Sequence, residues 1–154
     1  MKLNHTYKKF HLIITIFISG IFFILDQISK YIARTYPDAT FYLVKPWIGW
    51  EYFKNDGIAF GIPIPQIFLL LVTPIILIFF IHSLKKRKKS IHCLYGMGAV
   101  VAGAISNFID RLLFHTTIDY IRVGTSILNI ADIMIVLGAG LLIICELKNT
   151  KTKK

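Results

Sequence analysis

Four apolar runs divide the chain. They cover about residues 10–32, 67–84, 91–113 and 127–147. An α-helix rises about 1.5 Å per residue, so about 20 apolar residues cross the hydrocarbon core of a bilayer. The pattern predicts an all-α membrane protein with four transmembrane helices. The first run ends in Asp26 and Lys30 without a small-residue cleavage site, so we expect a retained span and not a cleaved signal peptide.

The region between the first two spans has a different pattern. Residues 40–65 are rich in aromatic and β-branched side chains, interrupted by Gly and Pro. This composition favours short strands and turns, and we expect a small extracytoplasmic β-rich segment at the membrane surface. The chain has 154 residues and no internal repeat. It therefore predicts a single membrane-embedded domain over residues 1–154.

Charge gives the predicted bundle an orientation. Twelve of the eighteen basic residues precede the first span, join the second span to the third or follow the fourth. Seven of the eight acidic residues lie on the opposite side. The positive-inside rule then places both termini in the cytoplasm. Because the net charge of +10 follows this topology, we do not expect nucleic-acid binding. The two cysteines, Cys93 and Cys145, fit neither a metal-ligand spacing nor a disulfide framework, and we expect two small buried hydrophobic side chains.

The polar residues of the spans gather at one depth, near the outer ends of the helices. Asp119 lies in the connection after the third span, and Asp132 is expected about 7 Å below a helix start at Ile127. An ionised carboxylate inside a membrane is costly, so Asp132 suggests a function. Helix-end ion pairs or a helix cap could explain the other members of this layer, which are Asp26, Lys30, Asn107, Asp110, Arg111 and Asn129.

Two carboxylates at one depth suggest a particular chemistry. If they lie close together, they cannot both ionise easily and they share a proton. The ionised carboxylate can take a proton from water while the protonated one polarises a carbonyl group, which is hydrolysis of the aspartic-protease type. The sequence contains neither G-x-S-x-G nor H-E-x-x-H. Of the five histidines only His115 lies near this layer, where it is a weak candidate for a substrate or loop contact.

Five short segments follow one another in a specific order. They are DQISK (26–30), NDGIAFG (55–61), AGAISNFIDR (102–111), TIDY (117–120) and LNIAD (128–132). Together they resemble the sequence blocks of the lipoprotein signal peptidases (signal peptidase II), which are four-span aspartic peptidases of the bacterial inner membrane. One such block alone would be weak, but five in order on the predicted topology are specific.

The resemblance implies that Asp119 and Asp132 are the catalytic pair. It implies that a second group lines the site, positions the substrate or supports the acids: Asn55, Gly57, Asn107, Asp110, Arg111, Asn129, Asp26 and Lys30. The implied substrate is a diacylglyceryl-modified prolipoprotein, cleaved just before its lipidated cysteine near the extracytoplasmic face. No metal or cofactor is implied. The expected partners are this substrate and membrane lipids, and we expect a monomer.

The chain departs from the family in several places. Ala102 and Ser106 stand where glycines are usual, Tyr120 replaces Phe, and the connection between the two aspartates is several residues shorter than expected. Two alternatives remain, the first because of the short connection and the second because acids can also form a proton or cation relay. One is a catalytically inactive homologue acting as a binding protein, and the other is a small proton- or cation-coupled transporter. A relay would need polar residues through the inner halves of the spans, where few are found.

Overall fold

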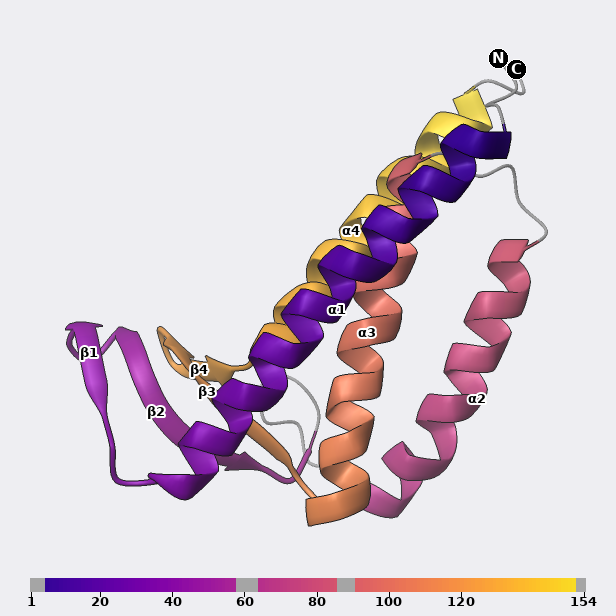
Figure 1. The fold of residues 1–154 in the computed structure, drawn as a ribbon. Coiled ribbons are helices and arrows are strands. Elements are labelled where there is room, and N and C mark those ends of the chain that lie inside the picture. Colours follow the sequence, from indigo (N-terminus) through magenta and orange to yellow (C-terminus); the bar gives the residue numbers. More distant parts are fainter. Residues whose placement is uncertain (1–4, 58–63, 86–90, 152–154) are drawn as a thin grey trace.

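The computed structural model describes residues 5–57, 64–85 and 91–151. The basic segment 86–90 and residues 58–63 of the NDGIAFG region lie outside this part of the chain. The described helices are α1 (His5–Thr35), α2 (Gln66–Lys85), α3 (Ile91–Phe114) and α4 (Ile130–Lys151). The strands are β1 (Phe41–Val44), β2 (Ile48–Asn55), β3 (Thr117–Val123) and β4 (Ser126–Leu128). The helices run side by side, and the strands lie at the end of the bundle opposite to the chain termini (Figure 1).

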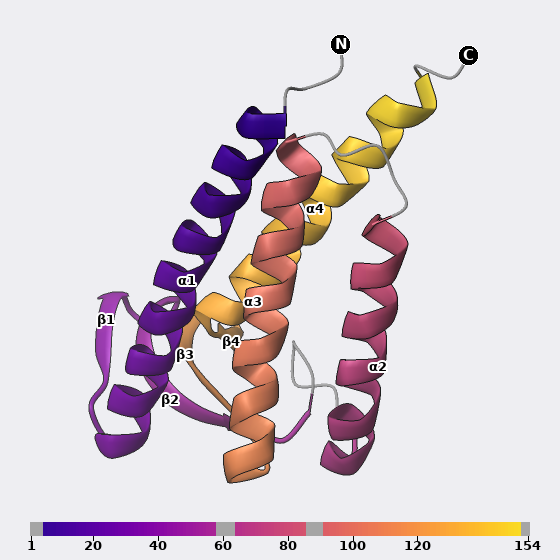
Figure 2. The same ribbon diagram turned by 45° about the vertical axis from the view of Figure 1, so that its right-hand side comes forward.

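Three of the described helices are long and apolar enough to cross a membrane. These spans are Lys9–Thr35, Ile91–Phe114 and Ile130–Lys148. The described apolar part of α2, Gln66–His82, is shorter. Figures 1 and 2 both place α3 between α1 and α2. The structure therefore supports a mostly helical membrane protein with three candidate spans.

The strands form one antiparallel sheet in the order β1-β2-β3-β4. The expected β-rich segment contributes only β1 and β2. The other two strands come from the connection between α3 and α4, so the description of the fold as all-α was incomplete. Gly124, with φ of 63°, begins the two-residue turn of this second hairpin.

The second hairpin also corrects the start of the last helix. Ile127 and Leu128 were expected in the fourth span, but they pair with Arg122 and Ile121 of β3. These apolar residues continue directly into the apolar helix, so hydrophobicity alone did not separate the strand from the helix. Consequently α4 begins at Ile130.

Helices α3 and α4 approach each other closely along glycines. A Cβ atom at Gly96 would lie 2.8 Å from the carbonyl oxygen of Gly138, and one at Gly103 would lie 2.5 Å from the carbonyl oxygen of Ala131. Small residues permit such backbone contact between membrane helices. The contact at Gly103 places the first turn of α4 directly against α3.

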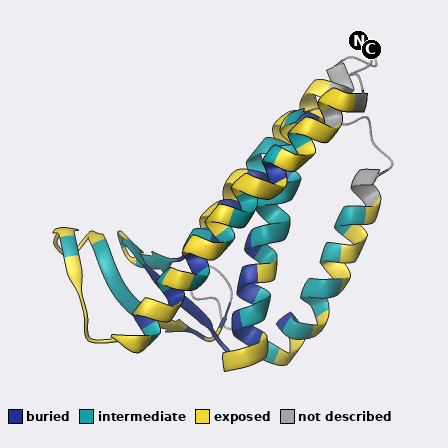
Figure 3. Ribbon diagram, viewed as in Figure 1, coloured by how far each residue is buried: buried dark blue, intermediate teal, exposed yellow. Residues whose placement is uncertain are grey.

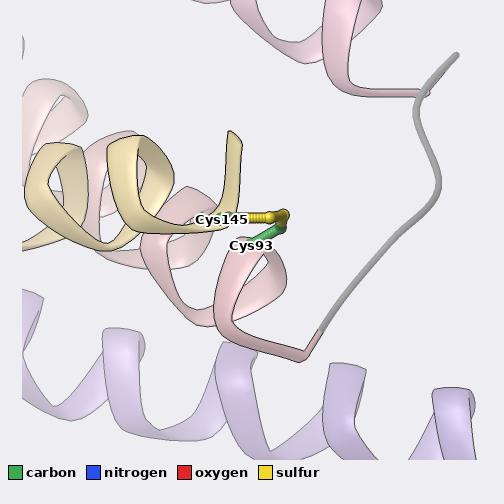
Figure 4. The surroundings of a disulfide bond; sticks show 2 residues. All are labelled: Cys93 and Cys145. Carbon is green, nitrogen blue, oxygen red and sulfur yellow. A yellow bond between two sulfur atoms is a disulfide. The ribbon is translucent and has the colours of Figure 1, made fainter. Parts of the chain in front are cut away.

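The two cysteines join the opposite ends of these helices. Cys93, in the first turn of α3, and Cys145, near the end of α4, form a disulfide with Cα atoms 5.7 Å apart (Figure 4). The expectation of burial is confirmed, because both side chains are buried, but the expectation of two separate thiols was wrong. The antiparallel packing of α3 and α4 brings together residues that are 52 positions apart in the sequence.

Buried residues concentrate where the helices meet the sheet, whereas most of the outer helix surface is exposed (Figure 3). Ala33, Ile118 and Tyr120 form a small apolar core at this junction. Many large apolar side chains face outward along the helices, including Phe17 and Phe79 at 68% and 72% exposure. Such surfaces suit lipid contact. The interior of the junction is mainly polar, which distinguishes it from an ordinary hydrophobic core.

Candidate active site

A cluster of polar side chains is buried at the junction of α1, α3, α4 and the sheet. Burying polar and charged groups is unfavourable unless they are hydrogen-bonded or paired. Nine of the ten residues singled out in the sequence are linked here by hydrogen bonds or ion pairs, and Arg111 lies beside them. The linked residues are Asp26, Lys30, Asn55, Gly57, Asn107, Asp110, Asp119, Asn129 and Asp132.

Asp119 lies on strand β3 and is fully buried. Its two carboxyl oxygens accept separate hydrogen bonds, one from the Asn55 side-chain amide at 2.8 Å and one from the Asn129 side-chain amide at 2.6 Å. Burial raises the pKa of Asp119 to about 7, and the negative charge of Asp132 adds to the increase, while both amide hydrogen bonds act against it. Near neutral pH this carboxyl group can therefore hold a proton.

Asp132 lies in the first turn of α4. Its backbone N–H donates to Oδ1 of Asn129 at 2.8 Å, and its own Oδ2 accepts from the backbone N–H of Asn129 at 3.4 Å. This is a reciprocal capping box. Asp132 is therefore closer to the helix start than the sequence predicted, because β4 occupies the residues expected to form the preceding turn. At this position the helix dipole favours the ionised carboxylate.

Three asparagine side chains each direct an amide N–H group at the acid pair. Asn55 and Asn129 donate to Asp119, and Asn107 donates to Oδ1 of Asp132 at 2.8 Å. The backbone N–H of Gly57 donates to Oδ1 of Asn55 at 2.9 Å and so orients that amide. The pair is held by donors from β2, α3 and the start of α4, which fixes both carboxyl groups in one place.

Behind the pair lies a fully buried ionic cluster. The Lys30 ammonium group lies 2.8 Å from Oδ2 of Asp26 and 3.1 Å from Oδ2 of Asp110. Asp110, for which the sequence allowed a helix-end ion pair, pairs with Lys30 of α1 and also accepts from the backbone N–H of Ile118 at 3.2 Å. The cluster connects α1 and α3 with β3 at Ile118, the residue before Asp119.

Arg111 completes the charged surroundings. It is buried at the end of α3, where the charges of Asp132, Asp110 and Asp119 act on it. Within the described part of the chain, its Nε atom is buried and has no hydrogen-bond partner. A buried donor without a partner is uncommon in folded proteins. Arg111 is therefore suited to donate to an oxygen atom of a bound molecule.

Two supporting residues were not identified from the sequence. The Tyr120 hydroxyl donates to Oδ1 of Asp26 at 2.8 Å, and the Ser106 hydroxyl donates to Oδ2 of the same residue at 2.6 Å. Burial raises the pKa of Tyr120 above its usual range, so it remains a donor. A buried Tyr needs a hydrogen-bond partner for its hydroxyl group. The position of Tyr120 next to Asp119 in the sequence could therefore have indicated a supporting role. His115 is exposed and terminates α3 in a left-handed conformation with φ of 57°.

The described residues contain no group of three or more His, Cys, Asp or Glu side chains that could hold a metal ion. What they do contain is two carboxyl groups in unequal environments, each of which accepts hydrogen bonds from asparagine side chains. Asp119 is enclosed and can be protonated near neutral pH, whereas Asp132 lies at a helix N-terminus. A pair of this kind can act as acid and base in hydrolysis.

Comparisons with known proteins identify the family to which the chain is similar. The family model described as "Signal peptidase (SPase) II" matches residues 18–148. Lipoprotein signal peptidases from Staphylococcus aureus strains JH9 and Newman are each 31% identical to the chain over 157 residues, covering 96% of the chain and 96% of each relative.

Two solved structures, both titled as a bacterial membrane enzyme structure, share the fold. One has a TM-score of 0.82 and 32% identity, and covers 91% of each chain. The other has a TM-score of 0.76 and 31% identity, and covers 87% of this chain and 92% of its own. The match in sequence and in fold extends over nearly the whole length. The chain therefore belongs to the signal peptidase II family and is a bacterial membrane peptidase.

Proposed function

We propose that this chain is an aspartic endopeptidase that removes the signal peptide from diacylglyceryl-modified prolipoproteins, cleaving before the lipidated cysteine. The observation that carries the proposal is the pair of Asp119 and Asp132, held by three amide donors at the end of the bundle. Membership of the peptidase family supports the reaction class. The unequal surroundings of the two acids support their separate roles.

In the proposed reaction Asp132 is the base and Asp119 is the acid. A water molecule between them transfers a proton to Asp132 while its oxygen attacks the carbonyl carbon of the scissile bond. Asp119, protonated because of its pKa of about 7, donates a hydrogen bond to the developing oxyanion. The C–N bond then breaks, and the proton held by Asp132 moves to the departing amine of the cysteine. The products are a signal peptide with a free carboxylate and a lipoprotein with a free amine.

Arg111 and the three asparagines position the reacting groups. The unpartnered Nε of Arg111 is proposed to bind a carbonyl oxygen of the substrate backbone. Asn55, Asn107 and Asn129 hold the carboxyl groups at a fixed separation, so that little reorganisation is needed in the transition state.

We also propose that α2 is a fourth transmembrane helix. Its 20 residues, Gln66–Lys85, correspond to about 30 Å of helix. Its side chains Ile78 and Phe79 are 69% and 72% exposed, as lipid contact requires. The basic loop after α2 and the basic chain ends favour cytoplasmic termini. With this orientation in the inner membrane, the acids lie near the extracytoplasmic face, where a lipidated cysteine following an apolar signal helix would present its scissile bond.

The alternative functions are less well supported. An inactive homologue has no need for a complete acid pair with a donor for each carboxyl group. A transporter requires a polar route across the membrane, and the inner halves of the spans are mainly apolar. Because the described site is built from one chain, a monomer is sufficient for the proposed reaction.

A complementation assay tests the proposal. In bacteria lacking their own enzyme, this chain is expected to restore cleavage of a diacylglyceryl-modified precursor, seen as a decrease in its mass. Asp119→Asn and Asp132→Asn should each abolish cleavage with normal membrane insertion. Asp38→Asn, which makes the same exchange at an exposed acid after α1, should cleave like the native chain. Processing by either dyad variant at the native rate would disprove the assignment.

A further inference from the structure

We infer that Lys30 is a positioning residue for hydrolysis, because its ammonium group sets the orientation of the Asn107 amide that donates to Asp132. This role rests on the proposed function. Among the described residues, Lys30 makes no hydrogen bond to Asp119 or Asp132, so it acts on the base through another residue. The route has two steps, from Lys30 to Asn107 and from Asn107 to Asp132.

The first step follows from the donors of Lys30. An ammonium group has three N–H donors and no acceptor. Three acceptors lie within 3.1 Å of Nζ: Asp26 Oδ2 at 2.8 Å, Asp110 Oδ2 at 3.1 Å and Asn107 Oδ1 at 2.8 Å. The side chain is only 1% exposed, so water does not compete for these donors. One of the three donors is therefore used on the amide oxygen of Asn107.

The second step follows from the asymmetry of an amide group. Since Lys30 can only donate, the amide of Asn107 must present its oxygen to Lys30 and its NH₂ group to the opposite side. On that side lies Oδ1 of Asp132, 2.8 Å from Nδ2. Were the amide reversed, its oxygen would face a carboxylate oxygen, and the two would repel unless Asp132 were protonated. Lys30 thus favours the ionised Asp132 that the proposed base requires.

In the other two amides of the site, the oxygen accepts from a backbone donor. The oxygen of Asn55 accepts from the backbone N–H of Gly57, and the oxygen of Asn129 accepts from the backbone N–H of Asp132. Among the described residues, the oxygen of Asn107 has one further donor, Nδ2 of Asn129 at 3.3 Å, and that amide already donates to Asp119 at 2.6 Å. Lys30 is the principal determinant of the Asn107 orientation.

A purely structural ion pair does not account for all of these contacts. Asp26 also accepts from the hydroxyls of Ser106 and Tyr120 and from the backbone N–H of Ala131 at 3.2 Å. Asp110 accepts from the backbone N–H of Ile118. Both acids therefore keep donors when Lys30 is removed, whereas Asn107 loses its shortest one. The largest consequence of removing Lys30 should accordingly be at Asn107 and Asp132.

A double-mutant cycle tests the inference. Purified enzyme in lipid vesicles would be assayed for kcat and KM on a diacylglyceryl-modified precursor. Lys30→Met and Asn107→Ala should each lower kcat by about 100-fold, a typical contribution of a catalytic base, with KM within about threefold of native. If Lys30 acts through Asn107, the double variant should also lose about 100-fold. Independent effects would multiply to about 10,000-fold and would overturn the inference.

Gln27→Met is the matched control. Gln27 lies on the same helix and donates to Oγ of Ser106 at 2.7 Å. This variant therefore also removes a side-chain hydrogen bond between α1 and α3, but it leaves the contacts of Asn107 in place. Its kcat should remain within about twofold of native, a ratio that corresponds to less than 1 kcal/mol. An equal loss in Gln27→Met and Lys30→Met would show that Lys30 only holds the helices together, and would overturn the inference.

A charge-conserving variant covers the case in which Lys30→Met does not fold. Lys30→Met combined with Asp110→Asn removes one positive and one negative charge, so the cluster keeps its net charge. Measured against Asp110→Asn alone, it should show the same loss of about 100-fold in kcat. A kcat equal to that of Asp110→Asn would overturn the inference. A native chain that does not cleave the precursor would instead disprove the proposed function itself, and the positioning role with it.

Discussion

Asn129 and Asp132 cap each other at the start of α4. The side chain of Asn129 accepts the backbone N–H of Asp132, the side chain of Asp132 accepts the backbone N–H of Asn129, and the Asn129 amide still has an N–H group for Asp119. The helix cap and the acid pair therefore share one residue. The geometry that begins the helix also sets the position of Asp132 relative to Asp119.

Substitution of Asn129 can separate its two roles, the cap of α4 and the hydrogen bond to Asp119. Asn129→Ser keeps an oxygen that can cap α4 but loses the amide N–H to Asp119, whereas Asn129→Ala loses both. We expect the Ser variant to melt near the native temperature and to cleave the precursor at least tenfold more slowly, given the usual contribution of an oriented donor. The Ala variant should in addition lose about 1 kcal/mol of stability. Thermal unfolding and cleavage rates measure the two effects, and native activity in Asn129→Ser would contradict the assigned contact.

The raised pKa of Asp119 predicts how cleavage depends on pH. The proposed acid must be protonated in the free enzyme, so kcat/KM should decrease as pH rises through about 7. The Asn55 amide stabilises the ionised form and so lowers this pKa. Asn55→Ala should therefore move the alkaline limb of the kcat/KM profile to higher pH, by about one unit for the loss of one hydrogen bond to a charged group.

Measurement at subsaturating substrate gives kcat/KM, which reports the pKa of the free enzyme. Asp38→Asn should leave the limb in place. A limb that stays at the native pH in Asn55→Ala, or moves to lower pH, would show that Asp119 is not the group whose protonation limits the reaction.

The sequence predicted the helices and the acids better than the sheet. The long apolar runs were correctly predicted to form helices, and the restriction of the acids to one end of the spans predicted where the candidate site would lie. The hairpin of β3 and β4 was missed because Ile127 and Leu128 merge into the apolar run of α4. Residues 117–123 do contain the β-branched and aromatic residues typical of a strand, but this signal is short.

The contacts within the site could not be predicted. Lys30 and Asn107 are 77 positions apart, and nothing in a single sequence indicates which of several polar residues the ammonium group will meet. The same applies to Tyr120, whose hydroxyl reaches Asp26 across 94 positions. Depth in the membrane restricts such residues to one layer, but the partners within that layer depend on helix rotation and on the register of the sheet.

Removal of the disulfide is expected to lower stability without changing activity. Cys93 and Cys145 lie near the chain termini, at the end of the bundle opposite to the acids (Figures 1 and 4). Replacing both with Ser should lower the melting temperature, because the cross-link between α3 and α4 is lost. Cleavage at a temperature well below unfolding should remain native. Counting free thiols by alkylation and mass spectrometry with and without reductant checks the bond, and two alkylated cysteines without reductant would contradict it.

Close packing at Gly103 predicts that one added methyl group will disturb the site. A Cβ at this position would lie 2.5 Å from the carbonyl oxygen of Ala131, the residue preceding Asp132, so Gly103→Ala must push the first turn of α4 away from α3. That movement lengthens the contact between Asn107 and Asp132, and we expect kcat to fall at least tenfold, since small displacements of catalytic groups are costly.

Gly140→Ala is the comparison, because it introduces the same methyl group on α4 with no atom within 4 Å of the new Cβ. Alanine is favoured over glycine in helices by about 0.5–1 kcal/mol, so this variant should be slightly more stable and fully active. Equal activity of the two variants would show that the first turn of α4 tolerates displacement, and that the position of Asp132 is set by its cap rather than by helix packing.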